Sequence, residues 1–188
     1  MTLEEQLAAF IPFNEQEAQD RALILHCLKT EPDIFTRQNR LAHMTASAWI
    51  VNASRTKALM AYHNLYHSWS WLGGHADGER DLLRVAMREA CEESGLRSVR
   101  PVSEAIFSVE SLTVDGHEKR GEYVSSHLHL NVTYLLEADE YGALAIKPDE
   151  NSDVRWFPLA DAPAASSEPW FVTRVYRKLN QKVLLLRA

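Results

Sequence analysis

The chain of 188 residues carries 26 acidic and 20 basic residues, and the resulting net charge of −6 at pH 7 argues against general binding of nucleic acid. Its 46% hydrophobic content suits one globular domain that folds without disulfides or metal, and its two cysteines exclude a disulfide scaffold or a four-thiolate zinc site. No apolar run approaches the roughly 20 residues of a membrane helix, and the N-terminus is acidic where a signal peptide is basic, so we expect a cytoplasmic protein without a membrane partner.

The first 40 residues predict an N-terminal helical arm that packs on the main domain. Asn14 followed by Glu17 resembles a capping box, and apolar residues then recur at helical spacing until Pro32 ends the run. From residue 44 the pattern changes to short strands. Residues 44–52 and 57–63 predict a hairpin, and a third strand over 68–72 ends at a pair of glycines. The main domain is therefore expected over residues 41–188.

The second half of the chain predicts a helix, three strands and a last helix. A helix over 81–94 ends at Gly95, which suits the left-handed C-cap position. Strands are expected over 99–110, 127–138 and 154–159. In the loop after the first of these strands, Lys119 and Arg120 are expected to be solvated charges. A final amphipathic helix over 169–185 has Pro169 in its first turn.

The segment from Gly73 to Leu96 contains the most informative residues. Along its helix the i, i+3, i+4, i+7 spacing predicts a buried apolar stripe made of Leu83, Ala86, Met87 and Ala90. Glu89, Glu92 and Glu93 share a different face, where like charges destabilise a helix unless something offsets them. A hard divalent cation would offset them, and the preceding glycine pair lets main-chain oxygens approach the same place. An acidic face that is only solvated is the alternative.

These residues resemble the Nudix box, G-x5-E-x7-R-E-U-x-E-E-x-G-U, in which U is aliphatic. Counted from Gly74, and inside a strand–loop–helix context, the chain matches at Arg88, Glu89, Ala90, Glu92, Glu93, Gly95 and Leu96. Position 80, where the first box glutamate belongs, is Arg80, and we interpret Glu79 as serving in its place after a loop one residue shorter. The resemblance implies an α/β (α+β) fold, the Nudix-type α/β/α sandwich with a mixed β-sheet. It assigns no role to the arm.

The resemblance also implies a reaction, the hydrolysis of a nucleoside diphosphate linked to another moiety by attack of water on phosphorus, with Mg²⁺ or Mn²⁺. Glu92 and Glu93 match the metal-binding pair, and the carbonyl of Gly73 is expected to join them. Glu89 matches a residue that binds metal or activates water, and Arg88 is expected to hold Glu89 by a charged hydrogen bond.

Four further residues are expected at the site. Members of the family often add a glutamate from a late loop as a ligand or base, and Glu150 is our candidate, with Glu122 as its rival. His75 follows the glycine pair, and His127 and His129 project to one side of a strand. These histidines are expected to contact the substrate, although His127 and His129 also suit a metal.

Two alternatives use the same fold. One is a non-catalytic ligand-binding or regulatory module, against which the intact set Glu89, Glu92 and Glu93 argues. The other is the diphosphate isomerase branch, which relies on a cysteine ahead of the box, whereas no cysteine lies between Cys27 and Cys91. The expected partner is a small-molecule diphosphate whose identity stays open. The oligomeric state is open too, a homodimer being common in the family.

Overall fold

The computed structural model describes residues 1–119 and 121–186. Arg120, expected to be a solvated loop charge, lies outside the described residues, and so does the side chain of Lys119. Within the described part of the chain, no helix is long and apolar enough to cross a membrane.

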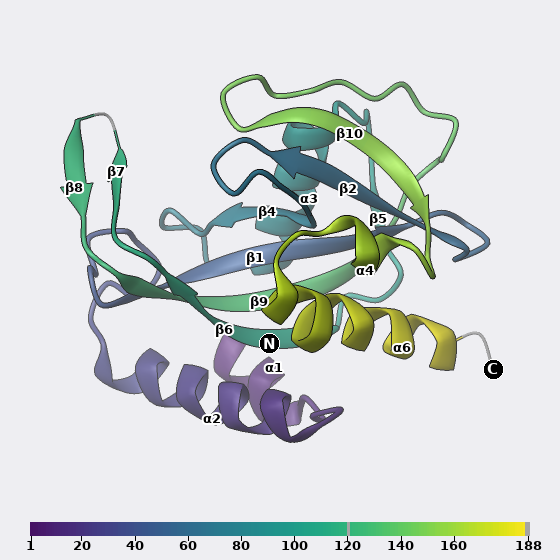
Figure 1. Ribbon diagram of the computed structural model, residues 1–188. Coiled ribbons are helices and arrows are strands. Elements are labelled where there is room, and N and C mark those ends of the chain that lie inside the picture. The colour runs from purple at the N-terminus through teal and green to yellow at the C-terminus, as the bar shows by residue number, and fades with distance from the viewer. Residues whose placement is uncertain (120, 187–188) are drawn as a thin grey trace.

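A curled, eight-stranded mixed sheet forms the centre of the molecule (Figure 1). Its main path runs β10–β2–β1–β9–β5, while β3, β4 and β6 pair with β2, β1 and β9. Strand β1 is parallel to β9, and all the other pairings are antiparallel. The strands are β1 (Ala42–Val51), β2 (Lys57–His63), β3 (Ser68–Ser70), β4 (Leu72–His75), β5 (Arg100–Pro101), β6 (Ser108–Val114), β9 (His127–Glu137) and β10 (Asn151–Pro158). A separate hairpin joins β7 (His117–Lys119) to β8 (Glu122–Val124).

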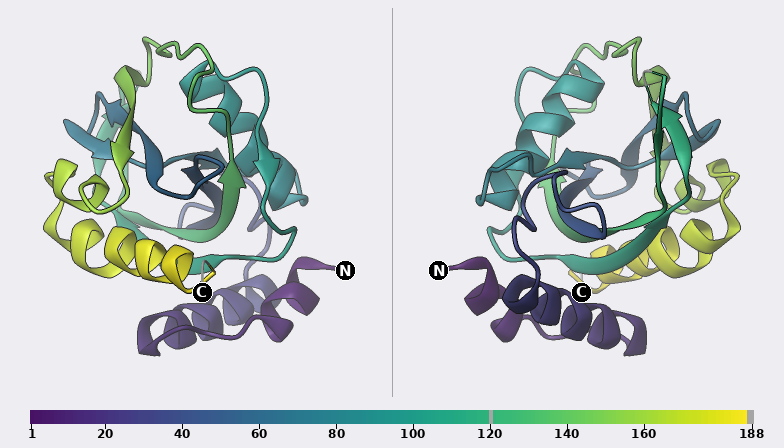
Figure 2. Two further views of the ribbon diagram at one scale, coloured as in Figure 1. Left: turned by 90° about the vertical axis from the view of Figure 1, so that its right-hand side faces the viewer. Right: turned by 90° about the vertical axis from the view of Figure 1, so that its left-hand side faces the viewer.

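Helices cover both faces of this sheet, which confirms the mixed sheet between helices (Figure 2). Strand β1 is buried along its whole length, as a central strand with two covered faces must be. Its even-numbered residues join α3 (Leu82–Ser94) in one core, whereas Trp49 and Val51 join the C-terminal helices in another. Those helices are α4 (Ala162–Ala165), α5 (Pro169–Phe171), the π-helix η1 (Val172–Tyr176) and α6 (Arg177–Leu185).

The N-terminal arm consists of α1 (Leu3–Ala9) and α2 (Glu15–Thr30). Asn14 caps α2 by accepting a hydrogen bond from the backbone N–H of Glu17, as its spacing predicts. The Glu17 carboxylate does not complete a capping box, because it accepts from the N–H of Phe13 instead. Leu7 and Ile24 are fully buried in the core that also contains α3, and α2 packs against β6 at the edge of the sheet. The arm thus shares the hydrophobic core of the main domain.

A buried charge cluster fastens the arm to the C-terminal helix. We use this name for Glu17 of α2, Glu110 of β6, and Lys178 and Lys182 of α6. The Glu17 carboxylate lies 2.8 Å from Lys182 Nζ and 3.5 Å from Lys178 Nζ, and Lys178 lies 2.9 Å from Glu110. The cluster contains two carboxylates and two ammonium groups, so the charges balance where little water reaches them.

Other expectations about local structure were also inaccurate, and the strand expected to end at the glycine pair is instead β3 and then β4, which contains both glycines. The stretch 99–110 is not one strand: β5 ends at Pro101, and β6 begins only at Ser108 and continues to Val114. The following polar loop contains the β7–β8 hairpin. On α3 the buried residues are Leu82, Val85, Ala86 and Ala90, whereas Leu83 and Met87 are only half-buried, so the apolar stripe is rotated from the one predicted.

Candidate active site

The loop and helix of the box follow directly from strand β4. Asp81 caps α3 by accepting a hydrogen bond from the N–H of Arg84 at 3.1 Å, and Gly95 ends the helix with a left-handed φ of 72°. In the turn before the helix, Gly78 has a φ of 93°, a conformation that favours glycine. These residues define where α3 begins and ends.

Glu93 is the buried carboxylate of the site, with 7% of its surface exposed. Its Oε2 accepts a hydrogen bond of 3.1 Å from the backbone N–H of Gly73. Burial raises the pKa of this carboxyl well above its ordinary value, and the nearby Glu150 and Glu89 raise it further. Burial and the neighbouring carboxylates therefore disfavour the ionised form of Glu93.

Glu89 lies against the backbone of Gly74. A Cβ atom at Gly74 would come within 2.6 Å of the Glu89 carboxyl carbon, so a larger residue would displace the carboxylate. Arg88 donates a hydrogen bond of 2.8 Å to Glu89 Oε1, as the resemblance implies. The glycine and the arginine together fix the position of this carboxylate.

Glu92 and Glu150 are connected through Lys147. The Lys147 ammonium lies 3.5 Å from Glu92 Oε2 and 3.0 Å from Glu150 Oε1. The structure therefore places Glu150 beside the box carboxylates. Its rival Glu122 lies in the β7–β8 hairpin, which stands apart from α3 in Figure 1.

Glu79 makes its contacts within the turn that begins α3. Its carboxylate accepts hydrogen bonds from the backbone N–H groups of Arg80 at 2.8 Å and Asp81 at 3.0 Å, and it lies 3.8 Å from Arg84. These backbone hydrogen bonds lower the pKa of Glu79. In this position the carboxylate stabilises the turn that begins α3.

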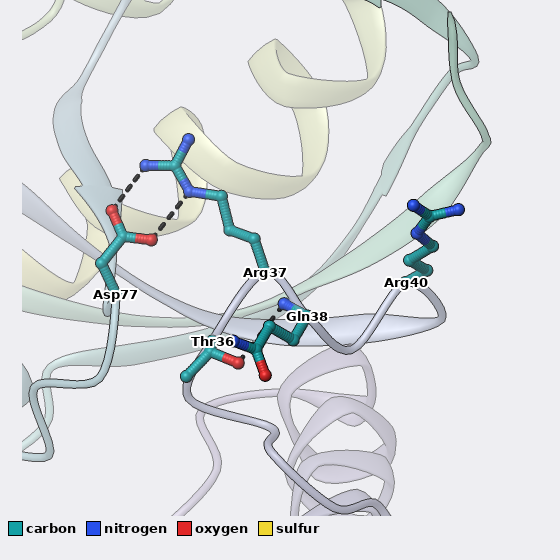
Figure 3. A pocket seen from close by; sticks show the side chains of 5 residues that line it. All are labelled: Thr36, Arg37, Gln38, Arg40 and Asp77. Atoms are coloured by element: carbon teal, nitrogen blue, oxygen red, sulfur yellow. Dashed lines mark hydrogen bonds and ion pairs between the residues drawn. The ribbon is translucent and has the colours of Figure 1, made fainter. Parts of the chain in front are cut away.

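An open pocket of about 680 Å³ lies beside the box loop. Four of its lining residues, Thr36, Arg37, Gln38 and Arg40, come from the segment that follows the arm, and the fifth is Asp77 of the box loop. Arg37 makes a bidentate ion pair with Asp77, with an Nε–Oδ1 distance of 2.7 Å and an Nη2–Oδ2 distance of 2.5 Å. The side chain of Arg40 lies apart from this pair (Figure 3). The hydrogen bond to Asp77 raises the pKa of Arg37, and weaker electrostatic attraction to Glu89 and Glu150 raises it further.

Four histidines gather on one face of the sheet next to this pocket. We call His43, His75, His127 and His129 the histidine cluster. His43 of β1 and His129 of β9 are register partners, and His75 of β4 is opposite Thr45, two residues beyond His43. The ring centroid of His43 lies 5.1 Å from His75, 4.8 Å from His127 and 5.0 Å from His129. Burial lowers the pKa of His43 and, together with its histidine neighbours, lowers that of His129 far below its ordinary value.

Sequence reasoning identified the carboxylates but missed Arg37 and His43. Arg37 lies in a part of the chain assigned to the arm, and no local pattern shows that it reaches the box loop. The alternation of β9 revealed that His127 and His129 share a side, but only the register of β1 against β9 brings His43 to them.

A model of the NUDIX domain family matches residues 41–179. The chain belongs to the Nudix family. This confirms the family and the class of hydrolase, one that acts on phosphoric anhydrides, which the Nudix box predicted. The match begins after Arg37, so this pocket residue lies outside the part of the chain that matches the Nudix domain.

Solved Nudix structures share the fold. A hydrolase of the NUDIX family from Clostridium perfringens superposes with a TM-score of 0.53 at 20% identity, covering 77% of this chain and 97% of its own. A C. elegans Ap4A hydrolase gives 0.51 at 19%, covering 77% and 98%. The E. coli dihydroneopterin triphosphate pyrophosphohydrolase gives 0.53 at 13%, covering 77% and 96%. A search of curated proteins finds no match.

Proposed function

We propose that this protein is a Mg²⁺- or Mn²⁺-dependent pyrophosphohydrolase that cleaves the diphosphate of a nucleoside diphosphate linked to another moiety. The observation that carries the proposal is the carboxylate cluster at Glu93, where a buried acid lies beside Glu89 and Glu150 and has one backbone N–H as its hydrogen-bond donor. Oxygen-rich sites of this kind suit hard divalent cations. Two of the three structural relatives, the Ap4A hydrolase and the dihydroneopterin triphosphate pyrophosphohydrolase, are named for different substrates, which supports the reaction class and leaves the substrate open.

We assign the cation to Glu92, Glu93 and the carbonyl of Gly73, with Glu89 and Glu150 next to it as further ligands or as the base that activates water. A divalent cation bound there neutralises charge on the diphosphate and in the transition state. Arg88 keeps Glu89 in place through its 2.8 Å hydrogen bond. A base needs to lie within hydrogen-bond reach of the attacking water, and both Glu89 and Glu150 flank Glu93.

We assign the substrate to the pocket beside the box loop. Arg37 and Arg40 provide positive charge for its phosphates, and a guanidinium suits this task because it binds oxyanions through two parallel hydrogen bonds. The rings of His75 and His127 lie 4.8 and 5.1 Å from that of His129, and we assign all three histidines to the substrate side of the site. Cys27 and Cys91 are both free, which agrees with a location in the cytoplasm. The homodimer is still a prediction, and light scattering would test it by measuring the molar mass of the protein in solution.

The test is a panel of nucleoside diphosphate derivatives assayed with Mg²⁺, with Mn²⁺ and with a chelator. We expect cation-dependent turnover of at least one class and a fall in kcat of at least about 100-fold in Glu93→Gln. Glu104→Gln, which removes an exposed carboxylate outside the site, is the matched control and should keep full activity. If no compound is turned over and Glu93→Gln binds ligands as the wild type does, the hydrolase proposal fails and the non-catalytic module replaces it.

A further inference from the structure

The histidine cluster contains a buried nitrogen without a protein partner. His43 is 5% exposed, and its Nδ1 lies 3.1 Å from the carbonyl oxygen of Asn39. Since that carbonyl only accepts, Nδ1 carries the proton and Nε2 presents a lone pair. Among the described residues no hydrogen-bond donor reaches this Nε2. An unsatisfied buried polar atom is costly, so its retention calls for a ligand.

A chain of hydrogen bonds fixes a second ring in the same way. His127 Nδ1 lies 2.9 Å from the carbonyl oxygen of Ser125, so this nitrogen donates and His127 Nε2 accepts. The Nε2 of His129 lies 3.3 Å away and supplies the proton. His129 is then left with its lone pair on Nδ1. Histidines that bind metals are usually oriented by such a hydrogen bond at their other nitrogen.

The third member of the set is His75. One ring nitrogen from each of His43, His75 and His129 lies within 4.8 Å of the others, so small side-chain rotations bring all three to a shared ion. The rings come from three strands of one sheet, β1, β4 and β9, which hold them rigidly. The Asp77 carboxylate, which is paired with the guanidinium of the nearby Arg37, offsets part of the positive charge there.

We propose that His43, His75 and His129 bind a transition-metal ion, for which Zn²⁺ is the best fit, with His127 orienting His129 from outside the ligand set. Three imidazoles form the ligand set of zinc sites that keep a fourth position open for water or a substrate oxygen. Imidazole suits Zn²⁺ and related ions, whereas Mg²⁺ takes oxygen ligands. The site is thus chemically distinct from the carboxylate site on α3, and it exists whether or not the proposed hydrolase activity does.

The test uses Co²⁺ as a spectroscopic substitute for Zn²⁺, with the full chain free of any histidine tag and in excess Mg²⁺ that saturates the carboxylates. We expect one Co²⁺ per chain, with the intense visible absorption of a four-coordinate ion, and its displacement by Zn²⁺. His43→Gln and His129→Gln should weaken Co²⁺ binding by more than about tenfold. His26→Gln, which changes an exposed histidine on α2, is the matched control and should bind as the wild type does.

Two further measurements guard against misfolded variants. His75→Gln changes a half-buried ring at the end of β4, so it provides a variant less prone to unfolding, with the same expected loss. Zn²⁺ should raise the Tm of the wild type and of Glu93→Gln but not of folded histidine variants, because only a bound ligand stabilises by mass action. Co²⁺ uptake that persists in all three histidine variants, or is abolished by Glu93→Gln, would overturn the proposal.

Discussion

Glu17 provides the sharpest test of whether the arm is part of the domain. Its Oε1 accepts from Ser108 Oγ at 2.7 Å and lies 2.8 Å from Lys182 and 3.5 Å from Lys178, while Oε2 accepts from the N–H of Phe13 at 2.7 Å. The substitution Glu17→Gln preserves the shape and removes the charge. It leaves two ammonium groups facing the single carboxylate of Glu110.

The expected cost follows from this imbalance. Removing one partner of a buried ion pair costs about 3–5 kcal/mol. We take the lower end, because burial already lowers the pKa of Lys182, so this group can lose its proton when Glu17 no longer stabilises the charge. A loss of about 3 kcal/mol corresponds to a fall in Tm of roughly 6–12 °C for a chain of this size.

The assay is urea denaturation followed by far-ultraviolet circular dichroism. Glu15→Gln, on the exposed side of the same helix, is the control and should change the free energy of unfolding by no more than about 0.5 kcal/mol. The double variant Glu17→Gln/Lys182→Met removes the surplus charge and should regain at least about 1 kcal/mol. A loss below about 1 kcal/mol in Glu17→Gln, or a separate early transition for the arm, would refute the reasoning.

Two other predictions concern the pocket and the charge cluster. Arg37→Lys keeps the positive charge but loses the bidentate geometry that the guanidinium shows toward Asp77 and that we assign to phosphate binding. KM should therefore rise about tenfold with a smaller change in kcat, whereas the exposed control Arg97→Lys should change neither. A fall in kcat alone would contradict the assignment. For Glu110, burial raises the pKa, but Lys178 and hydrogen bonds from Ser108, Lys178 and Asn131 outweigh it and hold the pKa below 4.5. Its charge therefore stabilises the fold above that value and ceases to do so as pH falls through the folded pKa. The difference in free energy of unfolding between wild type and Glu110→Gln should narrow as urea titrations move from pH 6 to pH 3, and a constant difference would show that Glu110 is not the titrating group.

The carboxylates of α3 were predictable because helical geometry alone relates them. Positions 89, 92 and 93 lie within one turn, so their common face follows from 3.6 residues per turn. Even on this helix the predicted buried stripe was wrong. The packing of α3 on the curled sheet buries Leu82 and Val85 more deeply than Leu83 and Met87, and no local pattern in the sequence encodes that packing.

The rest of the site depends on contacts between distant segments. The strand predicted over 99–110 had the right composition, but Pro101 ends β5 and pairing with β9 resumes only at Ser108. The Arg37–Asp77 ion pair depends on the segment after the arm, where Phe35 accepts a 2.8 Å hydrogen bond from the N–H of Gly78. No periodicity in the sequence indicates such a contact.

The parallel pairing of β1 with β9 determines when during folding the histidine cluster can form. His43 and His129 are separated by 129 − 43 = 86 positions, yet they are direct neighbours across the two strands. Closing so long a loop is slow compared with forming a local helix such as α3. Intermediates that contain α3 but lack the central pairing would carry the box glutamates on a formed helix and no histidine cluster. Binding of Co²⁺ or Zn²⁺ by the proposed histidine site during refolding would therefore report that the central sheet is complete. The circular dichroism signal of the helices cannot distinguish this stage.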